Sequence, residues 1–187
     1  MVLRYVNPIV VFDGYSQETT TKDVTHQKHV IGAASLRVKL ALDLPLKMEK
    51  KHFLSNNLNK QDFINMLSDE MKKENIATLH AEGDADMLIV QTAVNMAMHK
   101  TTFVIAEDTD ILVLLCHYYK PGTRLFMKSE KNTIKRPLWD INMTVAALGK
   151  RLCANLPFLH ALCGYETTSG LRGTGKGCVL LSKKKNR

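Results

Sequence analysis

Short runs of β-branched and aromatic residues alternate along this chain with stretches of helical periodicity. The run at Phe103–Ala106 is continuously apolar, as expected for a buried parallel strand. Helices between such strands favour a mostly parallel sheet with helical layers on its faces, so the sequence predicts an α/β fold. The expected strands are Val6–Asp13, Ile76–His80, Phe103–Ala106 and Thr123–Met127.

Helical spacing of apolar residues begins after residue 58. Asn59 is a plausible N-cap for a first helix, and Asn75 provides a stop signal before the next strand. Asp140 is a plausible cap for a later helix whose apolar positions extend to Leu152. The expected helices are Asn59–Glu74, Ala85–His99, the one that begins after Asp140, and Leu156–Cys163. The segment from Ile31 to Leu46 has no clear period and is left unassigned.

Two Asp-x-Asp pairs follow expected strands. Asp84 and Asp86 come after the strand at Ile76–His80, and Asp108 and Asp110 come after the strand at Phe103–Ala106. Open α/β sheets place their sites at the carboxyl ends of the strands. Carboxylates gathered there would repel one another without a positive partner. Hard divalent cations such as Mg²⁺ favour oxygen ligands, so the pattern predicts a metal site.

Composition is consistent with a folded domain and a polyanionic partner. The chain has 187 residues, 45% of them hydrophobic, which suits one domain with a sizeable core. Its formal net charge is +8 and its isoelectric point is near 9.3. Much of the basic excess lies in the last residues, from Lys183 to Arg187. Such a balance is compatible with nucleic acid binding without requiring it.

The four cysteines show no Cys-x-x-Cys spacing. In a chain without a signal peptide, this favours reduced thiols and an intracellular protein. Cys116 and His117 leave a zinc site open, although adjacent ligands are not the usual spacing. The longest apolar run, Ile111 to Cys116, is too short to span a bilayer. Secretion and membrane insertion are not expected.

A glycine-rich segment follows the last expected helix. Gly170, Gly175 and Lys176 nearly match a phosphate-binding P-loop, but Gly177 stands where Ser or Thr would hold Mg²⁺. A helix rather than a strand precedes the segment, so nucleotide hydrolysis and a nucleotide cofactor are not expected. A Gly-x-Gly turn that brings backbone N–H groups close to a phosphate and a flexible linker are the two remaining interpretations.

Taken in order, these motifs resemble the flap endonuclease family of 5′ structure-specific nucleases. The resemblance rests on Phe12-Asp13-Gly14, Asp84-x-Asp86, Glu107-Asp108-x-Asp110, Gly164-Tyr165-Glu166 and Arg172-Gly173-x-Gly175-Lys176. Two further motifs are similar to those of transposon-associated relatives in animal genomes: Thr21-Lys22-Asp23-x-Thr25-His26 and His160-Ala161-Leu162-Cys163-Gly164. The resemblance covers nearly the whole chain.

The resemblance implies a fold. Members of the family have a three-layer α/β/α PIN-like domain with a mostly parallel central sheet, which would here span residues 1–187 as a single domain. A helical hairpin over residues 164–180 would be its DNA-binding element. The family's first strand, which carries a further metal-binding aspartate, has no counterpart before Val6.

The resemblance also implies a site with two Mg²⁺ or Mn²⁺ ions. The residues that match the family's metal-binding and catalytic carboxylates are Asp13, Asp84, Asp86, Asp108, Asp110 and Glu166, the last in place of the family's Asp. Glu82 and Glu107 are expected to be flanking residues. The residues that match its nucleic-acid contacts are Lys22, His26, Lys28, Arg172, Gly173, Gly175 and Lys176.

Three functions follow from these expectations. The first is a metal-dependent nuclease of the 5′-flap type acting on branched or nicked DNA in the nucleus. The second is a module derived from such a nuclease that binds nucleic acid without cutting, since Glu166 is one methylene longer than Asp and the first strand is missing. The third is a protein-interaction domain that has kept the fold alone.

Overall fold

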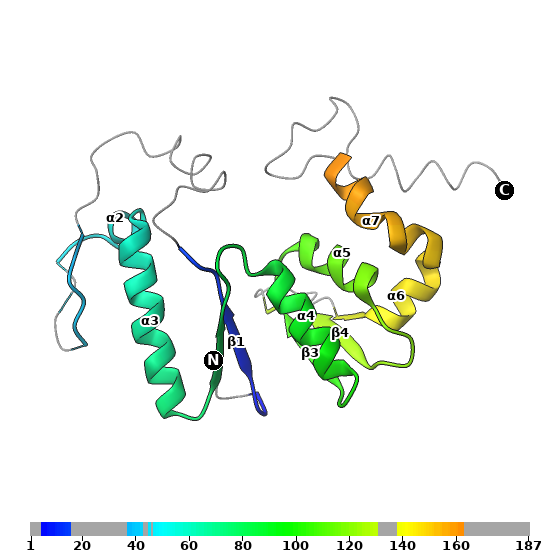
Figure 1. Cartoon of the computed structure of the whole chain (residues 1–187), viewed down its shortest axis with the longest axis horizontal. Coiled ribbons are helices and arrows are strands. Elements are labelled where there is room, and N and C mark those ends of the chain that lie inside the picture. Colours follow the sequence, from blue (N-terminus) through cyan, green and yellow to red (C-terminus); the bar gives the residue numbers. More distant parts are fainter. Residues whose placement is uncertain (1–4, 16–36, 43–44, 46, 131–137, 163–187) are drawn as a thin grey trace. The chain divides into compact units, whose positions relative to one another are not determined.

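The computed structural model describes residues 5–15, 37–42, 45, 47–130 and 138–162 (Figure 1). The chain divides into two units, residues 1–85 and 86–187, and each unit is described by itself. Helices and strands alternate in both, so the α/β class is confirmed.

Within its described residues, the first unit contains a two-stranded parallel sheet and two helices. Strand β1 (Ile9–Phe12) pairs with β2 (Ala77–His80), with Ile9 opposite Ala77. Helix α2 (Lys50–Leu54) leads into α3 (Asn57–Lys73), which packs on β2. At that contact the buried hydroxyl of Ser68 lies 2.7 Å from the hydroxyl of Thr78 and 2.9 Å from Nε2 of His80.

Helix α3 begins earlier than the sequence indicated. Asn56, not Asn59, is its N-cap, and the Asn56 side chain accepts hydrogen bonds from the backbone N–H groups of Leu58 and Asn59. Asn59 is instead fully buried, where it accepts from Val38 N–H and donates to the Phe53 carbonyl. The other end agrees with expectation, because Asn75 adopts a positive φ of 58° just after the helix.

The described part of the second unit contains a three-stranded mixed sheet and four helices. Its elements are α4 (Asp86–Ala97), β3 (Thr102–Ile105), α5 (Thr109–Tyr118), β4 (Leu125–Lys128), β5 (Leu138–Asp140), α6 (Ile141–Leu148) and α7 (Lys150–Leu162). Strand β4 lies in the middle, parallel to β3 and antiparallel to β5. The β-branched and aromatic runs therefore predicted β3 and β4 to within two residues, whereas β5 was not expected.

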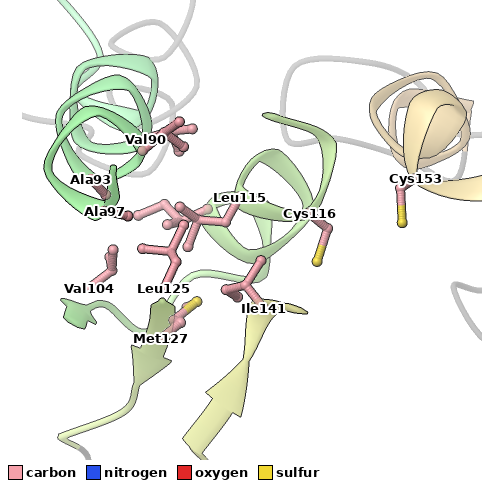
Figure 2. Packing of buried hydrophobic residues seen from close by; sticks show 12 residues of the cluster. Val90, Ala93, Ala97, Val104, Leu115, Cys116, Leu125, Met127, Ile141 and Cys153 are labelled. Atoms are coloured by element: carbon pink, nitrogen blue, oxygen red, sulfur yellow. The ribbon is translucent and has the colours of Figure 1, made fainter. Parts of the chain in front are cut away.

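The largest hydrophobic core lies in the second unit (Figure 2). Leu115 of α5 is 0% exposed and points toward Leu125 of β4, while Ile141 closes the core beside β5. Apolar residues of α4 and Val104 of β3 cover the other side. The helices that follow β2 and β3 in the sequence thus pack against β3 and β4 in this core.

Strand β3 is not the buried strand that its sequence indicated. Only Val104 faces the core, while Phe103 is 53% exposed and Ile105 is also exposed. Phe103 stacks on Phe126 of β4, with ring centroids 5.0 Å apart. A continuous apolar run does not distinguish a strand that is covered on both faces from a strand that is covered on one. The prediction of a buried strand was wrong for this reason.

Helices α6 and α7 divide at a residue different from the one expected. Gly149 has a φ of +83° and its N–H donates to the Val145 carbonyl, so α6 ends at Leu148 and Leu152 belongs to α7. Helix α7 therefore starts at Lys150 rather than Leu156. The expected cap was right: Asp140 accepts from Met143 N–H at 3.0 Å.

Among the helices of the described residues, none is long and apolar enough to cross a membrane.

Candidate metal centre

Asp13 stands at the carboxyl end of β1, where it is exposed. Its Oδ1 accepts a hydrogen bond of 2.9 Å from the backbone N–H of Ala85, and its Oδ2 lies 3.5 Å from the hydroxyl of Tyr15. Ala85 directly follows Asp84 in the sequence. The first expected carboxylate is thus tied to the segment that carries the second.

Gly14 explains why this tie is possible. Its N–H donates to the Gly83 carbonyl at 2.7 Å, and a Cβ at Gly14 would overlap the carbonyl oxygen of Ala81 and lie 2.7 Å from that of Glu82. Only glycine allows the backbone after β1 to approach the backbone after β2 so closely. The Asp-Gly sequence therefore has a packing reason independent of any metal.

Asp84 and Asp86 lie on either side of Ala85. Asp84 is exposed in the turn after β2, and Asp86 is the first residue of α4. A carboxylate in the first turn of a helix interacts favourably with the positive end of the helix dipole. Asp86 therefore has a local structural role whether or not it binds a cation.

Asp108 is exposed and acts as the N-cap of α5. Its Oδ1 accepts a hydrogen bond of 2.9 Å from the backbone N–H of Asp110. This is an ordinary capping interaction, which stabilises a helix by about 1 kcal/mol. The Asp-x-Asp spacing at this position is thus sufficient to begin a helix.

Asp110 is held differently from Asp108. Its Oδ1 lies 2.5 Å from Nε2 of His160 near the end of α7, and the two side chains are only 13% and 12% exposed. The pair joins residues 50 positions apart in the sequence. The contact thus ties the start of α5 to the end of α7.

Glu107 connects the residues that follow β3 to the residues that follow β4. Its carboxylate accepts hydrogen bonds from the Ser129 hydroxyl, at 2.8 and 2.9 Å, and from Glu130 N–H at 2.7 Å. Ser129 is buried. The expected flanking position of Glu107 thus has a structural role in joining the two strands.

Each unit places carboxylates after its parallel strands. Within the part of the chain that the structure describes, no three His, Cys, Asp or Glu side chains are grouped closely enough to hold an ion. The candidate donors that the structure describes are Asp13, Asp84, Asp86, Asp108 and Asp110. The chemistry of the donors fits Mg²⁺ or Mn²⁺, since all are carboxylates.

Eight expected residues lie outside the described residues. They are Glu166 of the metal set and Lys22, His26, Lys28, Arg172, Gly173, Gly175 and Lys176 of the nucleic-acid set. The segment 164–180, expected to form the helical hairpin, lies there as well.

Cys116 and His117 take part in the packing of α5 against α7. Burial raises the pKa of the Cys116 thiol to about 12, with Cys153 nearby as a second cause. Pro157 has no N–H to donate to the Cys153 carbonyl one turn earlier in α7. His117 lies with Nδ1 3.2 Å from that carbonyl oxygen and satisfies it.

Two features of the candidate site were not expected. The sequence motifs do not assign a role to His160, although its spacing from Cys153 and Leu156 places it on the inward face of α7. Lys60 of α3 lies 4.6 Å from the centre of the Tyr15 ring, beside Asp13. The helical spacing of apolar residues in α7 could have indicated that His160 faces inward. The contact of Lys60 with Tyr15 joins segments that share no sequence pattern.

Comparison with known proteins gives no match for this chain among family models, curated proteins or solved structures.

Proposed function

We propose that this protein is a divalent-metal-dependent, structure-specific DNA nuclease that hydrolyses phosphodiesters in branched or nicked duplexes. The observation that carries the proposal is the position of the carboxylates after the parallel strands. Asp13 follows β1, Asp84 follows β2, and Asp108 and Asp110 follow β3. The order matches the resemblance drawn from the sequence.

The chemistry needs no nucleophile from the protein. Bound Mg²⁺ or Mn²⁺ would supply an activated water and would stabilise the leaving oxygen of a phosphodiester. The task of this chain would be to fix oxygen ligands and admit the phosphate. Asp13, Asp84, Asp86, Asp108 and Asp110 would provide those oxygens, with Glu166 as a sixth.

The proposal includes a three-layer PIN-like fold. What supports it is the α/β class and the parallel pairing of β1 with β2 and of β3 with β4. The net charge of +8 supports a polyanionic substrate, and a DNA substrate would place the protein in the nucleus.

A cleavage assay on a labelled 5′-flap duplex tests the proposal. With Mg²⁺ or Mn²⁺ we expect metal-dependent cutting near the branch point that Asp108→Asn lowers by at least about a hundredfold, because removing a charged ligand removes stabilisation from the reacting phosphate. A matched control is Asp140→Asn, since Asp140 also caps a helix but follows no parallel strand.

Each outcome of the assay has a consequence. Cutting by the wild type that survives Asp108→Asn would contradict this site. Salt-sensitive binding of the flap duplex without cutting, weakened by the double change Arg172→Ala and Lys176→Ala, would instead identify a binding module derived from a nuclease. If the protein neither binds nor cuts the duplex, the protein-interaction function is the one that remains.

A further inference from the structure

The hydrogen bond between α5 and α7 fixes the carboxylate of Asp110 in one orientation. His160 Nε2 lies 2.5 Å from Asp110 Oδ1, and neither side chain is more than 13% exposed. A hydrogen bond from a ring N–H to an ionised carboxylate is stronger than one between neutral groups. Shielding from solvent strengthens it further, whereas exposed pairs contribute little.

The imidazole of His160 is carried by helix α7, which packs against the hydrophobic core of the second unit. Cys153 is buried two turns before His160, and Leu156 packs against the core cluster one turn before it, on the same face of α7. The His117 contact with the Cys153 carbonyl adds a second tie between the same two helices. His160 therefore reaches Asp110 from a docked helix, not from a loop.

We propose that His160 is a positioning residue for the metal centre, and this inference rests on the proposed function. By binding Oδ1, His160 would hold Asp110 so that Oδ2 is presented to a divalent cation. Carboxylates that bind metals are commonly hydrogen-bonded by a second residue, and loss of that residue typically weakens metal affinity by about 10- to 100-fold.

A purely structural tie between α5 and α7 is the alternative role, and the chain contains a matched control for it. His117 also joins α5 to α7, but its partner is the Cys153 carbonyl oxygen and not a carboxylate. Removal of either imidazole should lower the stability of the metal-free protein. Only removal of His160 should also weaken metal binding.

The experiment titrates the full chain with Mn²⁺ and follows the melting temperature, alongside the melting temperature in EDTA. We expect His160→Leu to raise the Mn²⁺ concentration needed for half of the shift by about 10- to 100-fold. His160→Gln should stay close to the wild type, because its amide Nε2 reaches nearly the position of the ring Nε2. His117→Leu should lower the melting temperature in EDTA and leave the Mn²⁺ dependence unchanged.

Equal Mn²⁺ dependence in His160→Leu and His117→Leu would overturn the inference and leave the metal site intact. Absence of any Mn²⁺ shift in the wild type would overturn the proposed metal site and this inference with it. If His160→Leu does not fold, His160→Gln is compared with His160→Asn, whose shorter amide does not reach Asp110. Equal Mn²⁺ affinity of those two variants would again contradict positioning.

Discussion

The two units of the chain hold their carboxylates in contrasting ways. In the first unit Asp13 is exposed and is fixed by the backbone N–H of Ala85, with Gly14 allowing the close approach. In the second unit Asp110 is shielded and is fixed by the side chain of His160. Both contacts join distant parts of the sequence, 72 positions apart for Asp13 and Ala85 and 50 for Asp110 and His160, so the difference lies in the partner: a backbone N–H for the first and a side chain on a packed helix for the second.

The two units also differ in how many apolar side chains they bury. The buried cluster around Leu115, Leu125 and Ile141 lies entirely in the second unit. The buried apolar residues described in the first unit are Phe53, Ile76 and Ala85. Hydrophobic burial should therefore stabilise the second unit more, and the first should depend more on backbone and polar contacts.

The largest expected effect comes from the core of the second unit. Leu115→Ala should lower the free energy of unfolding by about 2–5 kcal/mol, because it removes a fully buried side chain and leaves a cavity. Leu79→Ala makes the same change on β2, where the side chain is only half-buried, and should lower it by less than half as much. Urea unfolding followed by circular dichroism measures both. Equal losses would contradict the contrast between the two cores.

The next effect tests the close approach in the first unit. Gly14→Ala should lower the free energy of unfolding by about 1–3 kcal/mol, because the new Cβ meets backbone atoms that have no room to move. Gly83→Ala is the control, since nothing lies within 4 Å of a Cβ there. A thermal melt compares the two variants. If Gly83→Ala proved the more damaging, the account of the first unit would be wrong.

The smallest effect concerns the cap of α5. In metal-free buffer Asp108→Ala should cost about 1 kcal/mol, whereas Asp108→Asn should cost almost nothing because asparagine caps as well as aspartate. Asp140→Ala, the equivalent change at α6, should cost about as much as Asp108→Ala. Chemical denaturation in EDTA gives the values. A large loss with Asp108→Asn would mean that the charge itself stabilises the fold.

Features encoded by neighbouring residues were predictable from the sequence. The Asp140 cap, the stop at Asn75 and the approximate positions of β1 to β4 all depend on local residue types. The position of the carboxylates after the strands followed from the same local patterns.

Features that depend on distant contacts were not predictable. Which face of β3 is covered depends on α4 and α5, and Asn59 is buried because Val38 and Phe53 supply its partners. The pairing of Asp110 with His160 spans 50 residues, and nothing in either local sequence indicates the other residue. Apolar spacing on α7 predicts an inward-facing side chain but not its partner.

The most direct test of the metal centre is the change in melting temperature of the wild type and of Asp108→Asn on addition of Mn²⁺. An ion that binds only the folded state at 100 times its dissociation constant stabilises that state by about 2.7 kcal/mol. The account predicts a clear rise for the wild type that Asp108→Asn abolishes, although the two proteins melt alike in EDTA. Equal rises in both proteins, or no rise in either, would contradict it.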